Sequence, residues 1–225
     1  MAFSRSILWI SASGITVTPE NALRIVAVYR AVSILCDDVG TLPFQVFRRG
    51  EHGSPQRDEL DPRDVLIEQR PNPELIAAEL WGDFVMGHRL NWGNAYLFRE
   101  QGGDGLTKAL WPLRPDRTEP RRARAGELVY VTRLDSGEER ILLPEEVVHY
   151  RDLMVKGLKG ESRIKLARDS LGLGIAAERY GAGFFQRDGR PGGIIELPEN
   201  VSVTPEKVRE IKAKWKAGHQ GLERS

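Results

Sequence analysis

Apolar residues recur every three or four positions after Thr18, which is the pattern of a helix with one buried face. Thr18 suits an N-cap and Pro19 a first helical position, and Gly40 lacks a side chain, as residues at helix ends often do. We therefore predict one helix from Pro19 to Gly40, with Cys36 packed in the core beside its apolar stripe. The stripe comprises Ile25, Val28, Val32, Leu35 and Val39.

Beyond this helix, short apolar runs alternate with glycine and proline. The residues from Pro43 to Arg49 predict a strand, and those from Gly50 to Asp61 predict a polar loop. The residues from Asp64 to Gln69 predict one short helical turn.

Helical spacing returns after the motif Arg70-Pro71-Asn72-Pro73. Asn72 is the better N-cap and Pro73 the natural first helical residue, because a ring nitrogen costs nothing where no intrahelical bond is made. Gly93 is expected to end this helix. Its predicted buried face comprises Ile76, Ala77, Leu80, Trp81, Phe84 and His88, with His88 as a hydrogen-bonded core histidine.

The next part of the chain has the short spacing of strands. Asn94 is expected to bond backbone at a corner, and Ala95 to Arg99 predicts a strand. From Leu106 to Leu143, short apolar runs separated by turn residues predict a β-meander. The predicted elements are therefore helices together with antiparallel strands, which corresponds to the α+β class.

A long helix is predicted from Ser162 to Phe185, and it is rich in small residues. Each glycine destabilises a helix by roughly 1 kcal/mol relative to alanine, so Gly172, Gly174 and Gly181 suggest close approach of neighbouring helices. The alternative is that the helix breaks near Gly172 or Gly181. Further predicted elements are a turn at Gly189 to Gly193, a strand from Ile194 to Leu197, and a basic helix from Glu206 to Ala217.

Composition excludes several classes of protein. The 225 residues contain 33 Lys and Arg against 32 Asp and Glu, a net charge of +1, which does not favour tight binding to many phosphates. The single cysteine excludes an internal disulfide framework. Apolar runs are shorter than the roughly 20 residues that a membrane span needs, and no convincing signal peptide is present.

Catalytic and cofactor motifs are missing from the sequence. No phosphate-binding Walker loop occurs, and the glycine pattern at Gly172 to Ala177 lies inside a predicted helix, where it loses the basis of a dinucleotide site. The four histidines lack ligand spacing. We therefore expect no catalytic residues, no cofactor, no metal and no enzymatic activity. A hydrolase would require a pocket that joins His88 or His149 to carboxylates.

Two basic segments leave an alternative function open. The first could bind nucleic acid, or form a solvated loop, or face acidic residues of a neighbouring subunit, although no aromatic residues interleave its arginines. It comprises Arg114, Arg117, Arg121, Arg122 and Arg124. The second is the basic helix, with Lys207, Arg209, Lys212, Lys214 and Lys216. Segments 114–124 and 207–216 together define a non-catalytic nucleic-acid-binding protein as the second hypothesis.

Several short motifs occur in a characteristic order along nearly the whole chain. They are Ala31 to Cys36 with Leu42-Pro43, Arg70-Pro71-Asn72-Pro73, Gly93-Asn94-Ala95-Tyr96, Leu110 to Pro115, Val147-Val148-His149-Tyr150, Gly160-Glu161-Ser162, and Phe184-Phe185 before Gly189 and Pro191-Gly192-Gly193. In this order, the chain resembles the N-terminal half of the portal proteins of long-tailed bacteriophages and gene-transfer particles.

The resemblance implies a domain organisation. Residues 1–160 correspond to the wing domain, 161–186 to a stem helix beside a channel, and 187–225 to the beginning of the clip. It further implies stem packing through Gly172, Gly174 and Gly181, and contacts of the clip with terminase or adaptor through Lys207, Lys212 and Trp215.

The resemblance also implies a function and partners. Such proteins form a ring, usually of twelve subunits, at one capsid vertex, where the ring conducts double-stranded DNA without sequence specificity. Expected partners are further copies of the chain, the large terminase, the head-tail adaptor and a capsid or scaffold protein. The expected location is the virion, after synthesis in the bacterial host cytoplasm.

The family pattern continues past Ser225, with the rest of the clip, a second stem helix and the crown. We therefore expect that this chain is truncated, and that by itself it is monomeric or heterogeneous. A homogeneous dodecamer in light scattering would contradict that expectation.

Overall fold

The fold is described from a computed structural model, over residues 9–50, 53–155, 157–186 and 204–219. The chain divides into two compact units. Unit 1 comprises Met1–Trp9 and Val17–Arg168, and unit 2 comprises Ile10–Thr16 and Asp169–Ser225. Each unit is described by itself.

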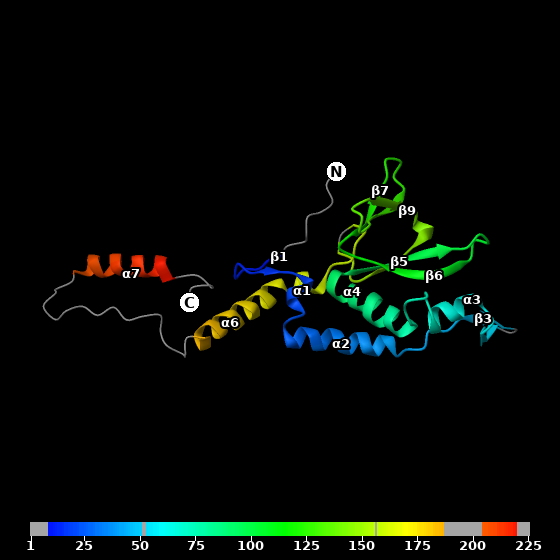
Figure 1. The fold of residues 1–225 in the computed structure, drawn as a ribbon, viewed down its shortest axis with the longest axis horizontal. Helices are drawn as coiled ribbons and strands as arrows, with labels where there is room; N and C mark the ends of the chain where they lie inside the picture. Colours follow the sequence, from blue (N-terminus) through cyan, green and yellow to red (C-terminus); the bar gives the residue numbers. More distant parts are fainter. Residues whose placement is uncertain (1–8, 51–52, 156, 187–203, 220–225) are drawn as a thin grey trace. The chain divides into compact units, whose positions relative to one another are not determined.

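Unit 1 combines helices with short antiparallel strands (Figure 1). Its helical elements are α1 (Pro19–Ala22), α2 (Val26–Gly40), α3 (Pro62–Asp64), η2 (Val65–Gln69), η3 (Glu79–Met86), α4 (Gly87–Trp92), η4 (Pro144–Glu146) and α5 (Arg163–Leu166). Its strands are β3 (Phe47–Arg49), β4 (Pro55–Arg57), β5 (Asn94–Gln101), β6 (Thr107–Leu113), β7 (Thr118–Arg122), β8 (Leu128–Arg133), β9 (Glu139–Leu142) and β10 (Val147–Arg151).

The remaining elements are two short strands and two helices. The strands β1 (Trp9–Ile10) and β2 (Thr16–Val17) pair with each other around the segment Ile10–Thr16 of unit 2. The helix α6 (Arg168–Gln186) begins at the last residue of unit 1, and α7 (Pro205–His219) belongs to unit 2. In the described parts of the chain, no helix combines the length and the apolar character needed to cross a membrane.

The first predicted helix is two helices, α1 and α2. Thr18 caps α1 as predicted, since its Oγ1 accepts a hydrogen bond from the Asn21 N–H at 3.2 Å, and Asn21 Oδ1 accepts one from the Thr18 N–H at 2.8 Å. The prediction of one helix from Pro19 to Gly40 is wrong, because the backbone of Ile25 is extended, with φ −74° and ψ 116°. This residue redirects the chain before α2 begins.

Helix α2 packs closely on η3, which confirms the predicted core position of Cys36. A Cβ atom at Gly82 would lie 2.6 Å from the carbonyl oxygen of Cys36, and one at Gly40 would lie 3.0 Å from the carbonyl oxygen of Ala78. The two backbones can therefore approach each other only because both positions are glycine.

The prediction that Asn72 caps the second helix, with Pro73 as its first residue, is wrong. Helical backbone begins at Ala77, and Asn72 instead closes a bend, where its Oδ1 accepts hydrogen bonds from the N–H groups of Glu74 and Leu75, both at 2.9 Å. The opposite end of this side chain is bound elsewhere, because Asn72 Nδ2 donates to the carbonyl of Leu110 in β6 at 2.8 Å.

The buried face of the second helix also differs from the predicted one. Its segment η3 is π-helical, with hydrogen bonds that span five residues. Its buried residues Leu80 and Val85 accordingly lie five residues apart. Ile76, predicted to be buried, is 50% exposed, and Phe84 and His88 are partly buried. Ala77, Leu80 and Trp81 are buried as predicted.

Two three-stranded antiparallel sheets form the β part, in the orders β10-β5-β6 and β7-β8-β9. The predicted strand from Ala95 to Arg99 and the predicted meander are confirmed, although the meander is divided between the two sheets. Tyr96, Tyr130, Leu142 and Val147 form a buried cluster that includes residues of both sheets. A second cluster joins β5 to η3 through Leu97, Leu80 and Trp81.

The predicted strand from Pro43 to Arg49 is reduced to its last three residues, β3. The predicted loop from Gly50 to Asp61 contains the partner strand β4. Val46 just before β3 is held by Asp64, whose Oδ1 accepts a hydrogen bond from the Val46 N–H at 2.9 Å. This long-range contact could not be read from local spacing.

The predicted small-residue helix is confirmed with a break at Ala167, which separates α5 from α6. Neither Gly172 nor Gly181 interrupts α6. The turn predicted at Gly189 to Gly193 and the strand predicted from Ile194 to Leu197 lie outside the described residues. The predicted basic helix corresponds to α7.

Candidate functional site

The end of α4 meets the segment that leads into α5 at Gly93. Gly93 has φ +77°, in the left-handed region, and its N–H donates to the carbonyl of Arg89 at 2.9 Å. A Cβ atom there would lie 2.6 Å from the carbonyl oxygen of Gly160 and would also collide with the backbone of Glu161. Gly93 ends the helix as predicted, and it also allows two backbone segments far apart in the sequence to touch.

Asn94 connects three segments through its buried side chain. Its Oδ1 accepts hydrogen bonds from the Gly160 N–H at 2.8 Å and from His149 Nε2 at 2.9 Å. Its Nδ2 donates to the carbonyls of Gly160 at 2.9 Å and of Trp92 at 3.2 Å. The predicted bond to backbone is therefore confirmed, and it spans 66 residues of sequence.

His149 is held in one tautomer by its neighbours. Nδ1 accepts a hydrogen bond from Arg151 Nε at 3.1 Å, which leaves Nε2 to donate to Asn94. The imidazole lies against the ring of Tyr96, with 4.3 Å between centroids. Burial, together with the nearby charges of Arg151 and Lys159, lowers the pKa of His149 to about 3. The ring is therefore neutral at neutral pH.

Ser162 attaches the first turn of α5 to the end of α4. Its buried Oγ donates to the carbonyl of Asn91 at 2.6 Å and accepts from the Lys165 N–H at 3.1 Å. The predicted N-cap is therefore confirmed. The same hydroxyl also binds the carbonyl of Asn91 in the last turn of α4, where carbonyls have no partner within the helix.

An ion pair closes one side of this site. Asp152 accepts hydrogen bonds from Arg163 Nε at 2.6 Å and Nη2 at 3.2 Å, and Arg89 Nη2 lies 3.6 Å away. Hydrogen bonding from Arg163 holds the pKa of the Asp152 carboxyl below its usual range. We name the group formed by Asn94, His149, Gly160, Ser162 and Asp152 the polar junction.

The motif Arg70-Pro71-Asn72-Pro73 covers the outer edge of strand β6. The carbonyl of Pro71 accepts the N–H of Leu110 at 2.8 Å, and Asn72 Nδ2 donates to the carbonyl of Leu110. Both outward backbone groups of Leu110 in β6 are thereby satisfied. Motifs that are separate in the sequence therefore meet at two places, the polar junction and the outer edge of β6.

A sequence model of the phage portal protein family matches residues 26–225, which include all of these motifs. The chain belongs to the phage portal protein family. It is 28% identical over 226 residues to a probable portal protein of Streptomyces phage phiC31, a match that covers 95% of this chain and 48% of that protein. It is 25% identical over 202 residues to the portal protein of Enterobacteria phage HK97, covering 89% of this chain and 47% of that protein. The chain thus spans about half the length of the curated portal relatives it matches.

Solved structures share the fold. A protein in the neck of an empty gene transfer agent particle, computed with C6 symmetry, superposes with a TM-score of 0.65 at 22% identity, covering 92% of this chain and 58% of that one. A portal protein of the HK97 family from Corynebacterium diphtheriae superposes with a TM-score of 0.55 at 16% identity, covering 93% of this chain and 61% of that one. At these identities, the likeness supports the portal fold alone.

Three of the five arginines in the arginine segment of this portal chain are paired with carboxylates. Arg114 donates to Asp116 at 3.0 and 2.8 Å, Arg117 pairs with Asp135, and Arg121 pairs with Glu119. Arg122 donates to the carbonyl of Gly126 at 2.8 Å, and Arg124 is exposed. The acidic partners reduce the positive potential that a phosphate backbone would need. A contact of this segment with another subunit or with nucleic acid stays a prediction.

The basic helix α7 is also partly neutralised. Lys207 Nζ and Lys214 Nζ lie 2.9 and 2.8 Å from the two carboxylate oxygens of Glu210. Lys212 is exposed and Trp215 is partly buried. The predicted contact of Lys207, Lys212 and Trp215 with terminase or adaptor is untested.

The three glycines predicted to pack in the stem have different surroundings. A Cβ atom at Gly172 would collide with the side chain of Ser11 and lie 3.1 Å from Ser13 Oγ, so this glycine packs within unit 2. Gly174 and Gly181 have open space within 4 Å of such an atom. Close packing is therefore seen at Gly172, against a loop of the same chain.

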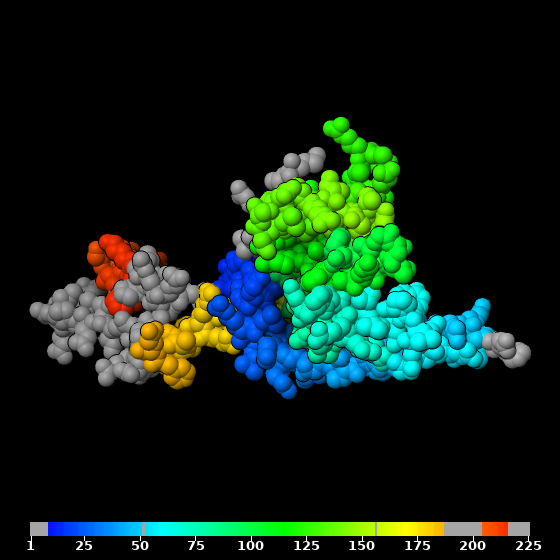
Figure 2. All heavy atoms as spheres, turned by 45° about the vertical axis from the view of Figure 1, so that its right-hand side comes forward, coloured from blue at the N-terminus to red at the C-terminus, as the bar shows by residue number. Residues whose placement is uncertain are grey.

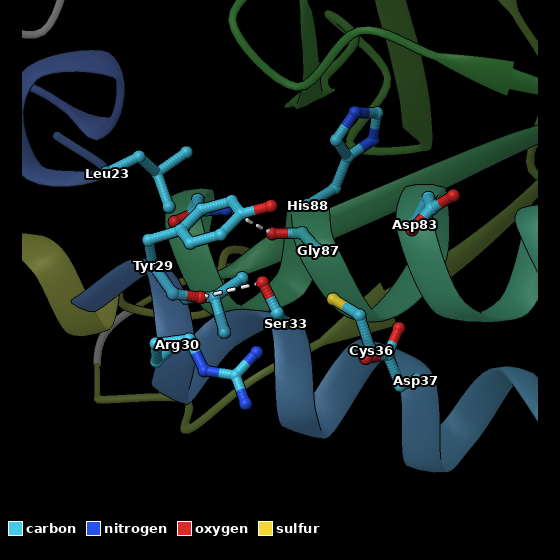
Figure 3. A pocket seen from close by; sticks show the side chains of 11 residues that line it. Leu23, Tyr29, Arg30, Ser33, Cys36, Asp37, Asp83, Gly87 and His88 are labelled. Carbon is cyan, nitrogen blue, oxygen red and sulfur yellow. Dashed lines mark hydrogen bonds between the residues drawn. The ribbon is translucent and has the colours of Figure 1, made fainter. Parts of the chain in front are cut away.

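A pocket of about 400 Å³ lies between α2 and α4 (Figure 3). Cys36, Asp37, Asp83 and His88 contribute to its lining, yet in Figure 3 the His88 ring extends away from Cys36 and Asp37. Burial, followed by the charges of Asp83 and Asp37, raises the pKa of the Cys36 thiol to about 11. Burial lowers the pKa of His88 to about 4, and its ring packs edge-on against Phe84.

These properties do not favour catalysis in the pocket. A protonated thiol is a poor nucleophile, and a histidine with a pKa near 4 is a weak base. Among the described residues, no three His, Cys, Asp or Glu side chains are grouped so that they could hold a metal ion. The missed signals of this site are tertiary: spacing alone did not indicate that Asn94, His149 and Ser162 would converge.

Proposed function

We propose that this chain is part of a portal protein that assembles into a ring of twelve subunits at one capsid vertex. The observation that carries the proposal is the family match over residues 26–225, together with a superposition on a protein in the neck of a gene transfer agent particle computed with C12 symmetry. That superposition has a TM-score of 0.60 at 19% identity and covers 98% of this chain and 60% of that one.

In this proposal, the function is geometric and not catalytic. A closed symmetric ring supplies a hole for double-stranded DNA and a docking face for the large terminase and the head-tail adaptor, while the ATP chemistry belongs to the motor. The net charge of +1 supports passage of DNA, because a channel that bound phosphates tightly would slow the DNA. Association with a capsid or scaffold protein completes the proposed set of partners.

The polar junction supports ring assembly by fixing the start of α5 on the sheet of unit 1. Every copy in a closed ring must present the same interface geometry, because small angular errors accumulate around the ring. Asn94 and Ser162 are buried and hydrogen-bonded on both sides, so the first turn of α5 has little freedom relative to β5 and α4. We propose further that Gly174 and Gly181 accept neighbouring stem helices in the ring.

The test is the assembly state of the complete product of the open reading frame that encodes this chain. Light scattering and electron microscopy should show a closed ring of about twelve copies. A product that stays monomeric at all concentrations would contradict the proposal. The 225-residue chain alone, measured in parallel, tests the separate expectation that it is monomeric or heterogeneous.

A further inference from the structure

The backbone at sheet edges decides where a second chain could add a strand. In an antiparallel hairpin, alternate residues direct their N–H and C=O groups away from the partner strand. The Gly50 N–H donates to the Ser54 carbonyl, and the Asp58 N–H donates to the Val46 carbonyl, so Phe47 and Arg49 direct their backbone groups outward from β3. Similarly, the Leu134 N–H donates to the Glu138 carbonyl, which leaves Glu139 and Ile141 directed outward from β9.

The other edges of unit 1 are each blocked or occupied at one position or more. Pro55 on β4 and Pro120 on β7 face outward at their edges and have no N–H to donate. The edge of β6 is covered at Leu110 by the bend at Pro71 and Asn72. At the edge of β10, the carbonyl of Arg151 accepts from Arg89. The outward groups of β3 and β9 have no such partner among the described residues.

The two open edges match each other in charge and in apolar side chains. Strand β3 reads Phe47-Arg48-Arg49, and β9 begins with Glu139, Arg140 and Ile141. Antiparallel pairing of the outward residues places Phe47 opposite Ile141 and Arg49 opposite Glu139. Phe47 is 55% exposed and Ile141 is 66% exposed, so pairing would cover two apolar side chains that now face water.

The same register places Arg48 opposite Arg140, which is unfavourable by itself. Both side chains already have partners, since Arg48 lies 3.9 Å from Asp58 and the Arg140 guanidinium lies 5.0 Å from the centroid of Phe98. Glu139 lies 3.5 Å from Arg133 in an exposed pair, so it can be shared with Arg49.

One chain cannot make this contact with itself. The hairpin of β3 and β4 lies at one end of unit 1, away from the sheet that contains β9 (Figures 1 and 2). We propose that β3 of one copy adds to β9 of a second copy as an antiparallel strand, with Phe47 opposite Ile141 and Arg49 opposite Glu139. The contact joins two different surfaces, so it can repeat around a ring; this inference rests on the proposed assembly.

Disulfide trapping tests the register. A chain with Phe47→Cys is mixed with a chain with Ile141→Cys under mild oxidation, and the products are separated without reductant. Because pairing raises the effective concentration of the two thiols, the mixed dimer should form about tenfold faster than with the control mixture of Phe47→Cys and Ala125→Cys. Ala125 is exposed at the turn between β7 and β8, and the native Cys36 is buried.

Charge exchange tests the same pairing independently. Arg49→Glu or Glu139→Arg alone should slow the trapping roughly two- to fivefold, and mixing chains that carry the two exchanges should restore it. Trapping no faster than the control, or homodimers of Phe47→Cys as the main product, would overturn the proposal. A ring seen by light scattering without this trapping would reject the pairing and keep the proposed function, whereas trapping without a ring would do the opposite.

Discussion

The polar junction and the arginine segment 114–124 are both rich in hydrogen-bonding side chains, but they differ in where their partners lie. Asn94 and Ser162 bond to groups 66 and 71 residues away and are buried. Arg114 and Arg121 bond to carboxylates two residues away, and neither arginine is buried, with 61% and 28% of their side chains exposed. The buried, long-range hydrogen bonds of the polar junction hold distant segments of the chain together. The ion pairs of the arginine segment mainly reduce its local positive charge and contribute little to stability.

The largest expected effect is at Gly93. Gly93→Ala would place a Cβ against the backbone of Gly160 and Glu161 at a φ of +77°, so we expect a loss of about 3 kcal/mol or more in the free energy of unfolding. Chemical denaturation would measure it. Gly174→Ala is the matched control, since open space surrounds Gly174 and alanine favours a helix. Equal effects of the two variants would contradict the close backbone contact assigned to Gly93.

The next largest effect is expected for Asn94→Ala. The variant leaves the buried N–H and C=O of Gly160 and the Nε2 of His149 without their partner, which should lower the free energy of unfolding by about 2–3 kcal/mol. Hydrogen exchange should accelerate at the Gly160 amide before it does at β8. Gln56→Ala on exposed β4 serves as the control and should change little. An unchanged Gly160 amide would argue against the junction.

Acid should weaken the junction through His149. Its folded pKa of about 3 lies below the unfolded value near 6.5, so the folded state favours the neutral ring. The contribution of His149 to the free energy of unfolding is therefore fully present above about pH 6.5 and is lost as the pH drops toward 3. Between pH 7.5 and 5 this loss should be roughly 2 kcal/mol. His88 acts in the same direction. Denaturation curves across this range should show a shallower pH slope in His149→Gln, and an unchanged slope would refute the assignment.

The smallest effect is expected in the arginine segment. Replacing Arg114 and Arg117 by alanine should change the free energy of unfolding by less than about 1 kcal/mol per pair, because exposed ion pairs contribute little. Adding Arg121→Ala makes the triple variant and removes a partly buried pair with Glu119. Binding to duplex DNA should be weak before and after the change. A sub-micromolar affinity with a steep salt dependence, lost in the triple variant, would instead favour nucleic-acid binding.

Local signals in the sequence were sufficient for elements whose ends depend on their own residues. Thr18, Ser162 and Gly93 each act where capping physics placed them, and the small-residue helix and the strands follow their spacing. The sequence also placed Cys36 in the core. Motif order indicated the family, because it combines many weak signals along most of the chain.

Errors arose where a distant contact changed a local preference. Asn72 Oδ1 accepts the N–H groups of Glu74 and Leu75, as an N-cap would, but these residues form a bend. Nδ2 of the same side chain is bound to the edge of β6, and the helix begins five residues later, at Ala77. The π-helical backbone of η3 changed the helical period, so Val85 became buried. Ile76 is exposed because it lies before the first residue of the helix. The convergence at the polar junction depends on tertiary structure, which periodicity does not describe.

The π-helical segment η3 has a consequence for how such chains can vary in length. A π-helical turn holds more residues than an α-helical turn over a similar rise, so a residue can be removed from η3 by tightening the backbone to an α-helix. Gly82 would then leave its contact with Cys36, but Gly93 could keep its place at the end of α4. Deletion of a single residue should therefore be tolerated between Glu79 and Met86 more readily than anywhere between Gly93 and Tyr96.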